Sequence, residues 1–367
     1  MNKSRLRELD FLRGIAILLV LLRHQPLFNF TSEMGWIGVD LFFVLSGFLV
    51  SGLLFKEYLK FGDIKPSLFL IRRGFKIYPI YYISFLFYLS LLLFKKDIKI
   101  VDLLSELFFI QNYTNGVGAI NPVSWSLAVE EHFYIGLVFI LWLSLKKKWI
   151  SLKENHQSLG FGRIEYSILG LMLLCLFLRL SYNSSYNFTS KSFTMTHLRI
   201  DSLFAGVLIA YFYFFKRAIL DQIMKFKYIL LILVVFGLFW TTYTPANISY
   251  FTVTIGFTLL FISFGLLLIY FLMEKNINKQ LNRFFSEPIV DMLSKIGYSS
   301  YSIYIFHIFV NKKIMRIIYD HTPYYNHRLN FIITSILSIL LGIIITNTIE
   351  KYFLRKRDER FPARKTE

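Results

Sequence analysis

Two ionisable residues, Arg13 and His24, lie in one apolar stretch close to the start of the chain. A charged side chain costs about 2.5–3.5 kcal/mol to insert into a membrane, so ionisable residues in such stretches mark function by default. His24 lies eleven positions after Arg13, which is close to three helical turns and to about 16 Å along a helix axis. The spacing predicts one helix face with a cation near one end and an imidazole near the other.

Ionisable residues interrupt several other apolar stretches as well. If these stretches span a membrane, one group lies near the level of His24: Asp40, Glu130, Glu131, Arg179, Arg199, Asp201 and His307. A second group lies near the level of Arg13: Arg72, Arg73, Lys76 and Glu350. Two polar groups at different depths, joined by the first helix, indicate a path across the membrane. Such a path serves transport, or chemistry between reactants on opposite sides.

The residue types favour chemistry. A histidine beside carboxylates suits general-base catalysis, because its ordinary pKa is near 6.5 and a nearby carboxylate raises it. Arg72, Arg73 and Lys76, which we call the basic cluster, lead into the third apolar stretch, and cations at a helix start suit phosphate binding. A base outside and a phosphate site inside fit transfer of an acyl group from a nucleotide-bearing thioester to an outward-facing hydroxyl.

These residues also have structural interpretations. His24 and His307 could form hydrogen bonds within the core, and the basic cluster could only mark the cytoplasmic side. Asp40 could cap a helix, and Arg199 and Asp201 could satisfy each other or their neighbours.

Glu130 and Glu131 are adjacent, so on a helix they point about 100° apart and rarely share one site. We expect one, with a preference for Glu131, to face the active site. The other then meets a structural partner such as Arg179 or Arg199.

The composition explains why these elements belong in a membrane. The 367 residues are 55% hydrophobic and only 17% charged, with a mean hydropathy of +0.53. Soluble chains are about 25% charged, so a soluble enzyme and a disordered chain are excluded. The single cysteine, Cys175, excludes a disulfide framework and a cysteine-based metal site, and we expect no metal.

Ten apolar stretches have spanning length, which predicts an all-α polytopic membrane bundle of about ten transmembrane helices. They are 11–29, 36–55, 77–94, 123–145, 166–182, 200–216, 226–241, 249–272, 293–315 and 329–352. We expect a membrane domain over 1–355 and a basic cytoplasmic tail over 356–367.

The net charge is +18, and the Lys and Arg residues are distributed unevenly between the two sides of the predicted membrane. Of 41 Lys and Arg residues, 29 lie in the termini and alternate loops on one side, nine on the other and three within spans. Cytoplasmic loops are enriched in such residues, so both termini are predicted to be cytoplasmic. The charge therefore indicates membrane lipid as a partner rather than nucleic acid. The sequence carries no signal for an oligomeric state.

Six motifs, in order, resemble those of acyltransferase family 3, a family of integral membrane acyltransferases. They are LDFLRGIAILLVLLRH, GWIGVDLFFVLSGFLVSG, FLIRRGFKIYPIYY, WSLAVEEHFY, HLRIDSLFAGVLIA and GYSSYSIYIFHIFV, and they run from residue 9 to about 310. Each alone is weak, but six in order are specific.

The resemblance implies an O-acyltransferase of the bacterial inner membrane. It implies acyl-CoA, above all acetyl-CoA, as donor and an envelope carbohydrate, free or lipid-linked, as acceptor: lipopolysaccharide O-antigen, peptidoglycan or exopolysaccharide. By the same resemblance His24 and Arg13 are the catalytic pair, the element around Arg72 and Arg73 concerns the donor, and the chain is a stand-alone form.

Two positions depart from the family pattern. Lys76 stands where the family often has Arg, which keeps the charge and loses the bidentate fork. His132 stands where it usually has Gln. Two other classes remain as alternatives: a transporter or flippase that uses the same polar track without chemistry, and a polysaccharide polymerase independent of acyl-CoA.

Overall fold

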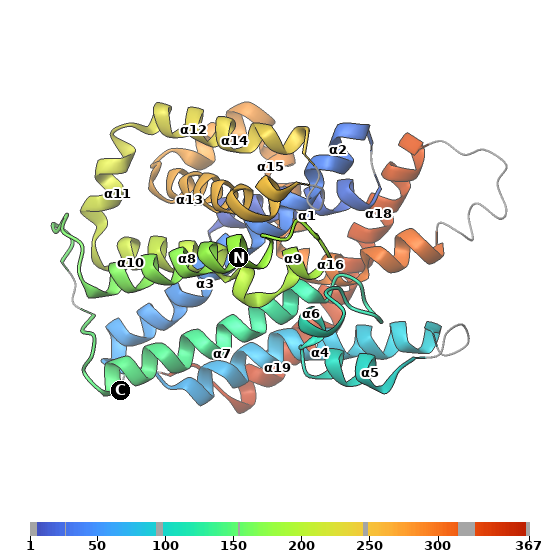
Figure 1. The fold of residues 1–367 in the computed structure, drawn as a ribbon, viewed down its shortest axis with the longest axis horizontal. Helices are drawn as coiled ribbons and strands as arrows, with labels where there is room; N and C mark the ends of the chain where they lie inside the picture. Colours follow the sequence, from blue (N-terminus) through green and yellow to red (C-terminus); the bar gives the residue numbers. More distant parts are fainter. Residues whose placement is uncertain are drawn as a thin grey trace.

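The computed structural model describes residues 6–25, 27–92, 98–152, 155–244, 249–314 and 327–364, and within them every regular element is a helix (Figure 1). The predicted all-α class is therefore confirmed. Some basic residues in the charge comparison lie outside the described residues: Lys3, Arg5, Lys95, Lys96, Lys153, Arg316 and Lys365.

The first half of the chain contains α1 (Arg7–His24), α2 (Asn29–Met34), η1 (Gly35–Ile37), α3 (Gly38–Phe61), α4 (Pro66–Leu92), α5 (Ile100–Leu107), α6 (Gln111–Thr114), α7 (Trp125–Lys146) and α8 (Arg163–Tyr182). The middle contains α9 (Lys191–Thr194), η2 (Thr196–Leu198), α10 (Ile200–Phe215), α11 (Arg217–Met224), α12 (Lys227–Phe239) and η3 (Trp240–Thr242). The last part contains η4 (Thr252–Gly256), α13 (Phe257–Met273), α14 (Ile277–Phe285), α15 (Glu287–Tyr298), α16 (Ser300–Phe309), η5 (Val310–Ile314), α18 (His327–Ile345), η6 (Thr346–Glu350) and α19 (Lys351–Arg360).

Six helical segments of the described chain are long and apolar enough to cross a membrane. They are Gly35–Phe61, Pro66–Leu92, Trp125–Lys146, Arg163–Tyr182, Thr252–Met273 and Arg328–Arg360. The pair α10 and α11, bent by 105°, makes a seventh if it counts as one span. The number ten and the cytoplasmic position of both termini stay predictions.

One expected span, 293–315, is broken. α15 ends at Tyr298, Ser299 leaves helical geometry with φ −93° and ψ 7°, and α16 begins at Ser300. The break places the side chain of Ser300 against Arg13 on α1, with a Ser300 Oγ to Arg13 Nη2 distance of 3.0 Å. A single hydrophobic run conceals such a break, because hydropathy does not register backbone geometry.

Glycines let two helix pairs approach closely. On α3 and α10, a Cβ added at Gly47 would lie 2.0 Å from the Leu203 carbonyl oxygen, and one at Gly206 would lie 2.2 Å from that of Val44. Small residues at membrane helix interfaces permit this close packing, which supplies contact where apolar burial gives little driving force. α3, against α10, then supplies one wall of the cavity described below.

The segment predicted as a tail packs against the bundle as far as it is described. α19 continues the last span to Arg360, and the Phe361 ring centroid lies 5.6 Å from that of Phe75 on α4. Arg364 then forms an ion pair with Asp63 at 2.7 Å. Residues 365–367 lie outside the described chain.

Candidate active site

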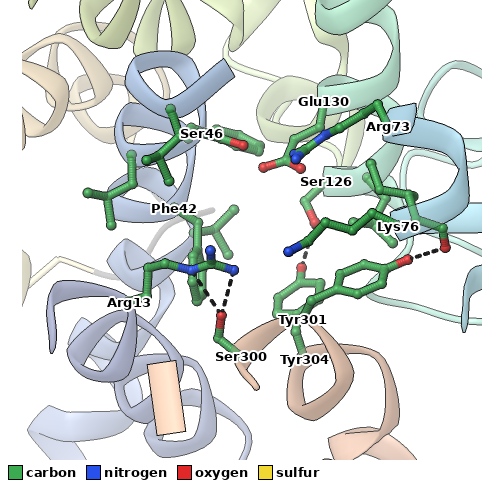
Figure 2. Close-up of a pocket in the computed structure, with 16 residues that line it drawn as sticks. Arg13, Phe42, Ser46, Arg73, Lys76, Ser126, Glu130, Ser300, Tyr301 and Tyr304 are labelled. Carbon is green, nitrogen blue, oxygen red and sulfur yellow. Dashed lines mark hydrogen bonds between the residues drawn. The ribbon is translucent and has the colours of Figure 1, made fainter. Parts of the chain in front are cut away.

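A cavity of about 100 Å³ lies between five helices. α1, α3, α4, α7 and α16 line it (Figure 2). Three cationic side chains and one carboxylate share its wall: Arg13, Arg73, Lys76 and Glu130. The rest of the lining is apolar or hydroxylated, including Phe42, Ser46, Ser126, Ser300, Tyr301 and Tyr304. The cavity is therefore suited to an anionic group.

Arg13 enters the cavity from α1. Its Nε and Nη2 donate to Ser300 Oγ, at 3.3 and 3.0 Å. The contact ties α1 to the first residue of α16.

Tyr134 lies at the centre of a second network, formed by α3, α4 and α7. Its hydroxyl donates to Glu130 Oε2 at 2.7 Å and accepts from Arg73 Nη2 at 2.6 Å. Ser46 Oγ lies 2.6 Å from the same hydroxyl. The sequence reasoning missed Tyr134 and Ser46. The signal for Tyr134 was its position four residues after Glu130, on the same helix face.

Lys76 is the third cation. Its ammonium points into the cavity in Figure 2, and its Nζ lies 3.5 Å from Oε1 of the buried Glu350. Glu350 ends the π-helical segment η6, and π-helical turns occur often at functional sites.

His24 does not line this cavity within the described structure. It ends α1, and its ring centroid lies 4.9 Å from that of His307 on α16. His307 is 1% exposed, and its Nδ1 donates to the Tyr304 carbonyl oxygen at 2.6 Å. Because Tyr304 also lines the cavity, one residue of α16 connects the cavity to the histidine pair.

The structure places Glu130 at the cavity, whereas the sequence favoured Glu131 for the site. Glu130 lines the cavity, whereas Glu131 accepts a hydrogen bond from Tyr78 at 3.0 Å. The expected partners Arg179 and Arg199 meet other carboxylates, so that expectation was wrong.

Those arginines form two buried ion pairs away from the cavity lining. Arg199 Nη2 lies 2.6 Å from Asp40 Oδ1, and Arg179 Nη1 lies 2.6 Å from Asp201 Oδ2. All four side chains are at most 2% exposed. Asp40 and Arg199, predicted near the substrate, thus pair with each other, Asp201 pairs with Arg179, and none of them lines the cavity in the described structure.

The basic cluster is divided. α4 begins at Pro66, so Arg72, Arg73 and Lys76 lie within the helix, and their expected position at a helix start was wrong. Arg73 and Lys76 line the cavity. Arg72 instead pairs with Asp358 at 3.0 Å and donates to the Phe361 carbonyl oxygen. Proline at a first helical position was the signal for the earlier start.

Glu106 on α5 is a further buried carboxylate that the sequence reasoning missed. Its Oε1 accepts from the Ile120 N–H at 2.6 Å, and its Oε2 accepts from Ser124 Oγ at 3.3 Å. Burial raises the pKa of Glu106 to about 7, against the opposing effect of these hydrogen bonds. Glu106 thereby holds the segment that leads into α7 and its Ser126.

The described residues contain no group of three or more His, Cys, Asp or Glu side chains that could hold a metal ion. The charged groups at the cavity are mainly cations, and cations suit an anionic substrate rather than a metal.

Comparison with known proteins assigns the family. Over 328 residues the chain is 29% identical to a Staphylococcus aureus (strain COL) protein named "Putative O-acetyltransferase", which covers 82% of this chain and 50% of that protein. Over 165 residues it is 27% identical to the Peptidoglycan O-acetyltransferase OatA of Listeria monocytogenes, which covers 41% of this chain and 26% of that protein. The chain spans about half the length of the first of these relatives.

The profile of acyltransferase family 3, described as an acyltransferase domain, matches residues 6–347. The match covers nearly the whole described bundle, including α1, the cavity and α16. The chain therefore belongs to acyltransferase family 3.

Proposed function

We propose that this chain is a membrane-bound O-acyltransferase that moves an acetyl or other short acyl group from cytoplasmic acyl-CoA to a hydroxyl of an envelope carbohydrate. The names of its relatives support acetyl as the group. The Listeria relative favours peptidoglycan as acceptor over O-antigen or exopolysaccharide. The bacterial cytoplasmic membrane is the location that this proposal requires.

One observation carries the proposal: a cavity with three cations lies on the same helices, α1 and α16, as the pair of His24 and His307. Acyl-CoA is a polyanion, and arginine is well suited to phosphate. Arg73 and Lys76 on α4 fit the phosphate-bearing donor.

His24 performs the proton transfers in this proposal. One ring nitrogen of His24 takes the proton of the acceptor hydroxyl while the oxygen of that hydroxyl attacks the thioester carbonyl carbon. The carbon–sulfur bond then breaks, and the leaving thiolate takes the proton from the His24 imidazolium. We predicted a carboxylate to orient His24, but the described residues place His307 against its ring instead.

Mass spectrometry of envelope carbohydrate from cells with and without the chain tests the proposal. We expect an acetyl-sized mass gain that needs the chain and is lost in His24→Ala. His156→Ala, an exposed histidine outside the site, is the matched control and keeps the gain. Carbohydrate with unchanged mass would favour a flippase, and altered chain length would favour a polymerase.

A further inference from the structure

Among the described residues, one ring nitrogen of His307 has a hydrogen-bond partner and the other has none. Its Nδ1 lies 2.6 Å from the Tyr304 carbonyl oxygen, which can only accept, so Nδ1 carries the proton. In the neutral ring Nε2 then has a free lone pair. That atom is buried and has no hydrogen-bond partner among the described residues. A histidine that served packing alone would not need this second nitrogen, and a buried acceptor without a donor is unfavourable.

The ring that faces His307 is that of His24. The two centroids are 4.9 Å apart and the ring planes are tilted by 51°. The same part of the chain also fixes the His24 backbone, because Asn311 Nδ2, in the π-helical segment Val310–Ile314, donates to the His24 carbonyl oxygen at 2.8 Å. His307 on α16 therefore contacts the ring of His24, and Asn311 on η5 binds its main chain.

The charged groups that act on His24 are cations. They are Arg23 from its own helix and Lys312 from η5, and His307 would act in the same direction if it were protonated. Cations oppose the formation of an imidazolium at His24. The lone pair on Nε2 of a neutral His307 would favour that imidazolium by accepting a hydrogen bond from it.

We infer that His307 is a positioning residue: its Nε2 accepts a hydrogen bond from a ring N–H of His24 and directs the other ring nitrogen of His24 at the acceptor hydroxyl. The inference rests on the proposed function. In the reaction His24 gains a second proton and becomes an imidazolium, and the bond to His307 persists and strengthens because its donor is now charged. His307 itself neither gains nor loses a proton.

Two amide substitutions separate the two nitrogens of His307. In His307→Asn the amide reaches the position of Nδ1 and can keep the bond to Tyr304, but it does not reach His24. In His307→Gln the amide oxygen reaches the position of Nε2 and can accept from His24. His307→Phe keeps a ring and removes both bonds. Phe309→Leu, on the same helix, alters packing against Phe87 without contact to His24, and serves as the control.

The experiment uses inside-out membrane vesicles from cells that express each full-length variant, with radiolabelled acetyl-CoA as probe. Initial rates of label transfer to envelope carbohydrate give the maximum rate per folded molecule and the donor KM. We expect His307→Phe and His307→Asn to lower the maximum rate about tenfold, the equivalent of one hydrogen bond to a charged group, with an unchanged donor KM. His307→Gln and Phe309→Leu retain most of the rate.

Equal losses in the Asn and Gln variants, or full activity in His307→Phe, would overturn the inference. A purely structural role would lower the amount of folded protein in all three His307 variants without the difference between Asn and Gln. His24→Ala, measured in parallel, distinguishes failure of the inference about His307 from failure of the proposed function. If it is inactive while His307→Phe is fully active, only the inference fails. If it is fully active, the proposed function fails and the inference with it.

Discussion

At the scale of single residues, Glu130 and Glu131 are neighbours whose carboxylates have different surroundings. Glu130 accepts from Tyr134, which also binds Arg73 at the cavity, whereas Glu131 accepts from Tyr78. The sequence predicted that the two would face apart, because adjacent helical residues point about 100° apart. It could not predict which one faces the cavity, because that depends on how α7 is rotated against α3 and α4.

This difference predicts unequal effects of the same substitution. Glu130→Gln removes the negative charge that balances Arg73 through Tyr134, so we expect acetyl transfer to fall about tenfold or more. Glu131→Gln keeps an acceptor for Tyr78 outside the cavity lining and should retain most of the rate. Label transfer from acetyl-CoA in vesicles measures both. A greater loss in Glu131→Gln would contradict the assignment of Glu130 to the site.

Glu106 predicts a pH dependence of stability. The pKa of Glu106 in the folded chain, about 7, lies above its ordinary value of 4.5, so the folded chain holds the proton more tightly than the unfolded chain. The stabilisation by protonation is complete below pH 4.5 and is lost as the pH rises to 7. Thermal unfolding in detergent between pH 5 and 8 should show a falling midpoint that is flatter in Glu106→Gln. An identical slope in both proteins would refute this.

At the scale of elements, the helix breaks and close helix contacts place the site. Arg13 and Ser300 meet because α15 and α16 are separate helices, and Tyr304 and His307 lie one and two turns further along α16. The motifs contain Arg13, Arg73 and Lys76, which line one cavity, but the sequence placed Glu130, a fourth lining residue, at another depth. Apolar length predicts only an approximate depth for each residue, and contacts between residues far apart in the chain follow from packing that hydropathy does not encode.

The buried pair of Asp40 and Arg199 predicts a loss of stability rather than of chemistry. Asp40→Asn leaves Arg199 uncompensated and should lower the free energy of unfolding by about 3–5 kcal/mol, while transfer per folded molecule changes little. The double variant Asp40→Leu with Arg199→Met should recover much of that stability. Thermal unfolding and vesicle assays check the two parts. Loss of transfer in a fully stable Asp40→Asn protein would return Asp40 to the substrate site.

The glycine contacts of α3 and α10 predict a second stability effect. Gly206→Ala places a Cβ 2.2 Å from the Val44 carbonyl oxygen and must push the helices apart, so we expect a clear fall in thermal stability. Gly170→Ala on α8 is the matched control, since its Cβ would meet no atom within 4 Å. The control should be neutral or gain up to about 1 kcal/mol from helix propensity. Equal midpoints in the two variants would refute the close contact.

At the scale of the whole molecule, composition predicted an all-α membrane bundle, and the helices of the described chain confirm that class. The charge asymmetry further predicts cytoplasmic termini. A fluorescent reporter that folds only in the cytoplasm should be active at either terminus, and a phosphatase that folds only outside should be inactive there. The opposite result at one terminus would mean an odd number of spans.

In the proposed reaction, a donor from the cytoplasmic side and an acceptor from the other side of the membrane meet at His24. Radiolabelled acetyl-CoA added outside sealed inside-out vesicles tests it most directly, with label in carbohydrate of the vesicle interior as the readout. We predict label in the interior carbohydrate with the natural chain and background with His24→Ala at equal protein. Equal labelling with both, or consumption of acetyl-CoA without labelled carbohydrate, would contradict the account.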